Sequence, residues 1–421
     1  MTGQVLIVVF GVLLFLNVPI AISLGAASIA ALYFGDLPLE MISSNVYAAT
    51  SKFVLLAIPF FILGGNIMEK TGISENLIAF CQSLVGHLKG GMAIVCVVVA
   101  CFFAAICGSG PATVAALGLI IIPAMVKAGY RVGFSAALIA TAGAIGLIIP
   151  PSISFVVYGS ITGNSIGNLF ISGILPGLLM GFFLILASFW LMRKEKMEVL
   201  PRASWAERWI AFRKAFWGLL MPVIILGGIY GGIFTPTEAA AVSAVYGFAV
   251  GIGYRTLSPK VFYEILVNST SQTAVVMLIV ATASLFSWVL TVEGIAADLS
   301  ASLLSFTGNN TFMFLLILNI ILLFAGCILD GNSAFFILTP IIYPVAMKLG
   351  VNPIHLGTVM VMNLAIGLVT PPVGINLYVS CGLAKLSLKE ISMDVWPFVL
   401  ASICALMLVT YIPAIALCLV P

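Results

Sequence analysis

A single carboxylate and a few hydroxyl groups lie inside long apolar segments of this sequence. Asp330, in the stretch CILDGNSAFF, is the only acidic residue in the middle of such a segment, and Ser109 and Thr113 lie in a similar stretch, CGSGPAT. Burying a charge among apolar residues is costly, so Asp330 is a candidate cation ligand. The alternative is structural: Asp330 orders its loop by hydrogen bonding, and the two hydroxyls bond to the backbone of their own helix.

Two Pro-Pro pairs interrupt further apolar segments, IGLIIPPS at residues 145–152 and IGLVTPPV at residues 366–373. Polar residues lie beside both pairs: Ser152, Ser154, Thr370 and Asn376. Proline frees an upstream carbonyl, and glycine allows close approach of the backbone. Freed carbonyls and hydroxyls suit a dehydrated Na⁺, and helix N-termini that begin in the GSGPAT and LDGNSA stretches suit a carboxylate. Alternatively, these residues permit kinks and hydrogen bonds between helices.

The composition identifies the environment of these residues. Of the 421 residues, 62% are hydrophobic and 7% are charged, and the mean hydropathy is +1.25. Soluble globular proteins carry about 25% charged residues, so this chain is a polytopic membrane protein embedded in a lipid bilayer. The net charge of +3 gives no indication of nucleic-acid binding. Scattered cysteines, two isolated histidines and the absence of a phosphate-binding loop argue against a zinc or haem site and against ATP hydrolysis.

The chain contains an internal repeat. Residues 110–151 align without a gap with residues 331–372, and thirteen of the 42 positions are identical. Glycine, proline and lysine residues match in register, which chance similarity between apolar segments rarely produces. We therefore expect two homologous halves, 1–192 and 217–421, joined by a linker at 193–216. Inverted repeats with paired broken helices near the bilayer midplane are typical of secondary transporters.

Each half is predicted to contain five membrane crossings and one re-entrant helical hairpin. The two hairpins are expected at about 91–126 and 311–347, and the two broken helices at about 132–162 and 355–382. The other predicted crossings are 4–17, 18–34, 53–69, 168–191, 218–234, 237–254, 273–292 and 395–419. Residues 74–88 and 259–268 are amphipathic and are expected to lie along the membrane interface.

The distribution of positive charge predicts the orientation in the membrane. The linker holds seven of the 17 Lys and Arg residues, which indicates that it is cytoplasmic. Because five is an odd number of crossings, the second half is expected to be inverted, with both termini periplasmic. Fifteen Lys and Arg residues then fall in cytoplasmic segments, and two, Lys52 and Lys348, fall outside. The first hairpin enters from the cytoplasm and the second from the periplasm.

The stretches CGSGPATVAALGLIIIPAMVKAGY and AGAIGLIIPPSISFVVYG resemble the large membrane subunit of tripartite ATP-independent periplasmic (TRAP) transporters, and the resemblance extends along essentially the whole chain. It implies an all-α, elevator-type importer of organic acids in the bacterial inner membrane, driven by Na⁺ as coupling ion. It also implies two partners, a small four-helix membrane subunit and a periplasmic substrate-binding protein. The substrates it implies are carboxylates such as C4-dicarboxylates, sialic acid and other sugar acids.

The resemblance also implies which residues bind the ions and the substrate. One Na⁺ is expected among Ser109, Thr113, Gly146, Pro150 and Ser152. A second is expected among Asp330, Asn332, Gly367, Thr370 and Pro371. The substrate carboxylate is expected beside Ser109, Ser152, Ser154, Asn332 and Asn376.

Three other functions are consistent with parts of this pattern. A stand-alone Na⁺/anion symporter or antiporter shares the architecture but needs no periplasmic protein. An ion channel also places polar groups at membrane depth. An intramembrane serine hydrolase is the third alternative, because GSG around Ser109 resembles a nucleophile motif. His87 and His355 are predicted near the ends of spans, too far in depth to act as its base.

Overall fold

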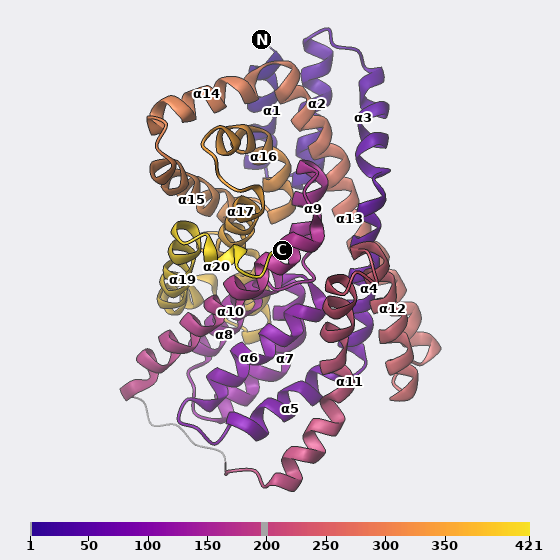
Figure 1. Cartoon of the computed structure of the whole chain (residues 1–421), viewed down its shortest axis with the longest axis vertical. Helices are drawn as coiled ribbons and strands as arrows, with labels where there is room; N and C mark the ends of the chain where they lie inside the picture. Colours follow the sequence, from indigo (N-terminus) through magenta and orange to yellow (C-terminus); the bar gives the residue numbers. More distant parts are fainter. Residues whose placement is uncertain (1, 195–200) are drawn as a thin grey trace.

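The computed structural model describes residues 2–194 and 201–421 (Figure 1). The described residues form α-helices, with three short 3-10 helices, and contain no β-strand. This confirms the predicted all-α class. The number of crossings, the re-entrant character of the hairpins and the inversion of the halves stay predictions.

The first half begins with two short helices, as its short apolar runs predict. Its helices are α1 (Thr2–Phe15), α2 (Ile20–Phe34), α3 (Glu40–Thr50), η1 (Phe53–Leu56), α4 (Ala57–Lys70), α5 (Ile73–Val85), α6 (Gly91–Cys107), α7 (Gly110–Lys127), α8 (Val132–Ala144), η2 (Ile145–Leu147), α9 (Ile153–Thr162) and α10 (Ile166–Leu191), followed by η3 (Met192–Lys194). The predicted hairpin corresponds to α6 and α7, and the predicted broken helix to α8 and α9.

The second half has the same order of hairpin and broken helix. Its helices are α11 (Trp205–Tyr230), α12 (Pro236–Gly253), α13 (Pro259–Val292), α14 (Ile295–Thr307), α15 (Thr311–Ile328), α16 (Gly331–Lys348), α17 (Pro353–Gly367), α18 (Ile375–Ala384), α19 (Leu388–Tyr411) and α20 (Ala414–Leu417). Helices α7 and α16 both contain 18 residues, and α9 and α18 both contain 10.

Seven of the described helices are long and apolar enough to cross a membrane. Two of the seven, α7 and α15, are arms of the expected hairpins. Of the remaining expected crossings, 237–254 corresponds to the 18-residue α12, and the others consist of shorter helices, as α8 with α9 and α17 with α18 illustrate. The Pro-Pro pairs explain these two broken crossings, because each pair divides an apolar segment into two helices of 15 residues or fewer.

Helix α13 differs from the sequence prediction. An interfacial arm at 259–268 and a separate crossing at 273–292 were expected, but one continuous helix of 34 residues covers both. The prediction of a separate arm is therefore wrong, since no glycine or proline after Pro259 interrupts the helix. Similarly, α11 begins at Trp205, so twelve residues of the expected linker are helical, and part of the linker, 195–200, lies outside the described residues.

The broken helices occupy the centre of the molecule. All residues of α8 from Phe134 to Ala144 are buried, as are all residues of α17 from Ile354 to Gly367. The first hairpin lies in the lower part of Figure 1 beside α5, and the second lies in the upper part beside α14. The two hairpins therefore approach the buried broken helices from opposite ends of the molecule.

The helices form two packed groups. In one group α1 packs on α2, helices α2 to α4 pack with α13, and α4 packs with α12. In the other group α7 and α8 pack with α18, and α19 packs with α8 and α10. Contacts of α13 with α16 and of α4 with α6 join the groups. Figure 1 shows α3, α4, α12 and α13 on one side and α15, α17 and α19 on the other. The hairpins and broken helices thus lie against a separate wall of helices.

Candidate functional site

The first hairpin turns at Gly108 and Ser109. Gly108 has a φ of 65°, and Ser109 is extended and precedes α7. Thr113 Oγ1 donates a hydrogen bond of 2.8 Å to the carbonyl oxygen of Ser109. The backbone bonding that we considered as an alternative for Thr113 is therefore present, and its hydroxyl oxygen keeps lone pairs for a further partner.

The first Pro-Pro break packs against this turn. A β-carbon added to Gly146 would lie 2.9 Å from Thr113 Oγ1 and 3.0 Å from the carbonyl oxygen of Ser109. The structure therefore brings these three residues together, and only glycine permits so close an approach. Ser152 is fully buried; its hydroxyl donates to the carbonyl oxygen of Leu147 and accepts a 3.5 Å bond from Phe155 N at the start of α9.

The second hairpin turns at Leu329 and Asp330, and Asp330 caps α16. Asp330 Oδ2 accepts hydrogen bonds from the N–H groups of Asn332 at 3.1 Å and Ser333 at 3.3 Å. Asp330 Oδ1 accepts a bond from the Ser333 hydroxyl. The structural role that we considered for Asp330 is therefore present. A carboxylate has about four lone-pair positions, so this cap leaves room for a cation.

The second Pro-Pro break packs against the end of α15. A β-carbon added to Gly367 would lie 2.5 Å from the Cα atom of Gly326. The next residue of α15, Cys327, has its Sγ atom 3.4 Å from the carbonyl oxygens of Thr370 and Pro371. The Thr370 hydroxyl donates a 2.8 Å bond to the carbonyl oxygen of Ile366. The Pro150–Pro151 and Pro371–Pro372 peptide bonds are both cis.

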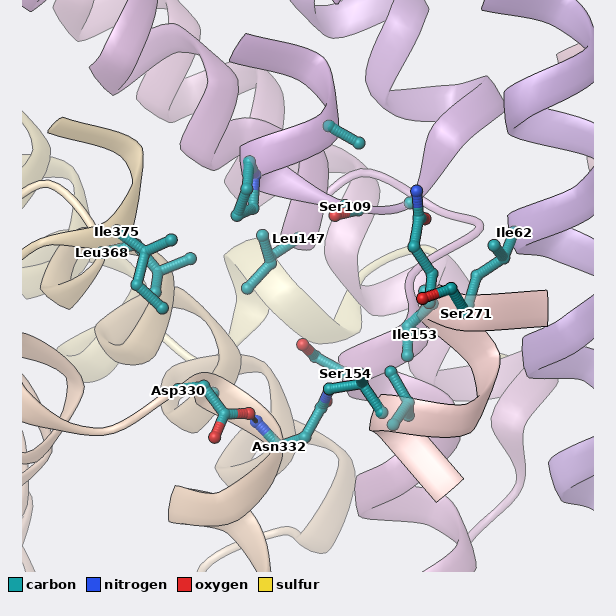
Figure 2. A pocket seen from close by; sticks show the side chains of 17 residues that line it. Ile62, Ser109, Leu147, Ile153, Ser154, Ser271, Asp330, Asn332, Leu368 and Ile375 are labelled. Atoms are coloured by element: carbon teal, nitrogen blue, oxygen red, sulfur yellow. Dashed lines mark hydrogen bonds between the residues drawn. The ribbon is translucent and has the colours of Figure 1, made fainter. Parts of the chain in front are cut away.

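One cavity of about 420 Å³ lies where both turns and both breaks meet (Figure 2). It is lined by Ile62, Gly108, Ser109, Pro111, Ala112, Leu147, Ile153, Ser154, Ser271, Gln272, Val275, Val276, Asp330, Gly331, Asn332, Leu368 and Ile375. Of the residues expected to bind substrate, Ser109, Ser154 and Asn332 line the cavity. Ser152 and Asn376 are fully buried outside this lining.

Four helix N-termini converge on the cavity. Helices α7, α9, α16 and α18 begin at Gly110, Ile153, Gly331 and Ile375, and each contributes a lining residue at or beside its first position. Helix N-termini present free N–H groups and partial positive charge, which favour an anion. Among the described lining residues there is no Lys, Arg or His. The positive potential in the cavity therefore comes from helix N-termini.

One wall of the cavity comes from α13 and was not predicted from the sequence. Ser271 and Gln272 contribute its polar side chains, and Ile62 of α4 lies beside them (Figure 2 labels Ser271 and Ile62). The sequence feature that could have revealed this wall is NSTSQT at 268–273, a run of six consecutive polar residues inside α13.

Comparison with known proteins identifies the class and then the family. The fold is similar to that of the Alcanivorax borkumensis YdaH transporter, with a TM-score of 0.65 over 99% of this chain and 100% of that chain at 15% identity. The two chains therefore share an all-helical fold. Residues 7–415 match the family described as the DctM component of tripartite ATP-independent periplasmic transporters.

Two relatives support the same family. The chain is 40% identical to the C4-dicarboxylate TRAP transporter large permease protein DctM of Rhodobacter capsulatus, over 98% of each chain. It is 44% identical to the isethionate TRAP transporter permease protein DctMQ of Oleidesulfovibrio alaskensis, over 96% of this chain and 64% of that one. The chain therefore belongs to the DctM family of TRAP large membrane subunits, which are multi-pass permeases of the inner membrane, and the expected resemblance is confirmed.

Proposed function

We propose that this chain imports a small organic acid anion together with Na⁺, as the large permease subunit of a TRAP transporter. The observation that carries the proposal is the convergence of four helix N-termini and the Asp330 carboxylate on one cavity. The N-termini favour an anion, whereas Asp330 disfavours it. A cation held beside Asp330 removes this conflict, so anion and cation bind together.

The two Na⁺ ions are assigned to the two pairs of turn and break. The first ion is assigned hydroxyl and carbonyl oxygens of the first turn and the first break: Ser109, Thr113, Gly146, Pro150 and Ser152. The second ion is assigned oxygens of the second turn and the second break: Asp330, Asn332, Gly367, Thr370 and Pro371. Each Na⁺ moving inward gains roughly 2.3 kcal/mol per 100 mV of membrane potential, in addition to its concentration gradient.

The substrate class follows from the relatives and the cavity. The named substrates of the two relatives, C4-dicarboxylates and isethionate, are short organic anions. Such an anion fits a cavity of about 420 Å³ whose donors are hydroxyls, amides and helix N-termini. A C4-dicarboxylate is our first candidate, and sialic acid or a similar carboxylate is the next.

The two groups of helices suggest how the cavity reaches both sides of the membrane. The hairpins and broken helices form the moving part of an elevator, and α1 to α4 with α11 to α13 form its scaffold. The position of α5 and α14 at opposite ends of the molecule supports two inverted halves (Figure 1). In this arrangement the linker is cytoplasmic, both termini are periplasmic, and a periplasmic binding protein and a small membrane subunit complete the transporter.

The experiment that tests this function is uptake of a labelled C4-dicarboxylate into proteoliposomes. The chain is reconstituted alone, with the small subunit, and with the small subunit plus the binding protein. We expect uptake only with both partners. Uptake by the chain alone would instead identify a stand-alone symporter or antiporter, and uptake that does not saturate with substrate concentration would identify a channel.

A further inference from the structure

Asn376, the second residue of α18, joins the two halves of the chain. Its side chain is fully buried, and its Nδ2 donates a 3.1 Å hydrogen bond to the carbonyl oxygen of Ala140 in α8. This bond fixes the orientation of the amide, so Oδ1 faces away from Ala140. Among the described residues, Asn376 Oδ1 has no hydrogen-bond partner. An unpaired buried acceptor costs roughly 1–3 kcal/mol, which indicates a missing partner.

The Asn376 amide lies against the turn of the first hairpin. A β-carbon added to Gly110 would lie 3.2 Å from Asn376 Nδ2 and 3.3 Å from Asn376 Oδ1. Gly110 directly follows Ser109, whose carbonyl oxygen receives the Thr113 hydroxyl. An amide oxygen of the second half therefore lies beside the first residue of α7 in the first half, one position after Ser109.

Both side chains already donate one hydrogen bond. The Thr113 hydroxyl and one N–H of the Asn376 amide donate to backbone carbonyls. The oxygens of both side chains keep lone pairs, which a hard cation needs. A cation also satisfies Asn376 Oδ1 without requiring a further donor.

We propose that Asn376 Oδ1 is a ligand of the first Na⁺, so that the second half completes the ion site of the first half. This inference rests on the proposed Na⁺ coupling. It replaces the expected contact of Asn376 with substrate, because Asn376 is buried outside the cavity lining. Its neighbour Ile375 does line the cavity, so an ion held by Asn376 fixes the start of α18 and with it part of the substrate cavity.

Ser380 provides a matched control on the same helix. One turn after Asn376, the buried Ser380 hydroxyl donates a 2.7 Å bond to the carbonyl oxygen of Ala136, so it also ties α18 to α8. Ser380→Ala removes a bond between the halves without removing an unpaired oxygen. Asn376→Leu removes the bond and the oxygen, whereas Asn376→Asp keeps an oxygen and loses the amide donor.

The experiment measures Na⁺ binding in two ways. The first is the Na⁺ concentration that half-maximally stabilises the purified protein against heat, with choline as the reference cation. The second is the half-saturating Na⁺ concentration for substrate uptake in the presence of both partners. We expect Asn376→Leu to raise both values about ten-fold, as loss of one ligand worth about 1.4 kcal/mol predicts. We expect Ser380→Ala to stay within two-fold of the unsubstituted protein, and Asn376→Asp to retain Na⁺-dependent stabilisation.

Two outcomes overturn the inference in different ways. If the unsubstituted protein responds to Na⁺ but Asn376→Leu matches Ser380→Ala, Asn376 is not a ligand and the proposed coupling stands. If the unsubstituted protein shows no response to Na⁺, the coupling fails and the inference fails with it. Should Asn376→Leu not fold, loss of the Na⁺ response in a folded Asn376→Asp protein would contradict the inference.

Discussion

Ser154 and Asn376 occupy the second positions of α9 and α18, and each lies against the first residue of the hairpin arm from the other half. Ser154 Oγ lies 3.9 Å from the place where a β-carbon on Gly331 would be, and Asn376 Oδ1 lies 3.3 Å from the corresponding place on Gly110. Each Pro-Pro break therefore packs against its own hairpin, while the helix that follows it reaches the opposite hairpin. This crossed packing makes one cavity from two halves.

The charge of Asp330 can be separated from its role as a helix cap. Asp330→Asn keeps an oxygen that accepts from the N–H groups of Asn332 and Ser333 but removes the negative charge. We expect this variant to fold normally and to need a several-fold higher Na⁺ concentration for uptake. Asp330→Ala should in addition lose about 1 kcal/mol of stability with the cap.

Uptake at graded Na⁺ concentrations and thermal unfolding of the purified variants check these expectations. An unchanged Na⁺ dependence in Asp330→Asn would remove Asp330 from the ion site. Its capping role would then be its only role.

Gln272 of α13 is expected to contact the substrate through its side-chain amide. It lines the cavity from the wall that α13 forms. Gln272→Leu removes one hydrogen-bonding partner, so the half-saturating substrate concentration should rise roughly three- to ten-fold. The half-saturating Na⁺ concentration should stay unchanged, because the proposed ion ligands lie on the hairpins, the breaks and α18, not on α13.

Thr270→Val is the matched control for this substitution, since Thr270 lies in the same polar run but does not line the cavity. Concentration dependence of uptake separates the two variants. Equal effects of the two substitutions would show that the run is needed only for folding or insertion.

The close approach of α17 to α15 predicts that Gly367 tolerates no side chain. A β-carbon there would lie 2.5 Å from the Gly326 backbone, which cannot rotate away. We expect Gly367→Ala to lower stability by roughly 1–3 kcal/mol and to abolish uptake, because the second break moves away from the turn that it supports.

Gly382 of α18 supplies the comparison, because no described atom lies within 4 Å of the position of its β-carbon. Gly382→Ala should be neutral or stabilising by up to about 1 kcal/mol, since alanine favours the helix. Thermal unfolding of both proteins measures the difference, and similar unfolding temperatures would contradict the packing argument.

Local sequence signals predicted the turns and breaks well. Gly108, Asp330 and the Pro-Pro pairs act within a few residues of themselves, so the ends of α6, α7, α15 and α17 fall close to the expected positions. Helix α13 was divided wrongly because its polar run resembled the edge of a membrane span. Two residues of that run, Ser271 and Gln272, instead line a cavity whose other walls come from residues more than 50 positions away.

The contacts of Asn376 could also not be predicted from the sequence. Its position beside a Pro-Pro pair indicated a ligand-binding role, and the sequence could not indicate that it packs on Ala140 and Gly110, more than 220 residues earlier. Contacts between the halves depend on how two remote segments pack. A repeat in the sequence shows that the halves are related but not which side chains meet.

The most direct test of the account is whether a Na⁺ gradient drives accumulation of the substrate. Proteoliposomes that contain the complete transporter are given a labelled C4-dicarboxylate at equal concentrations inside and outside, with Na⁺ only outside or at equal concentrations on both sides. The account predicts net accumulation inside with the inward gradient and none with equal Na⁺. Accumulation that is the same under both conditions would contradict it.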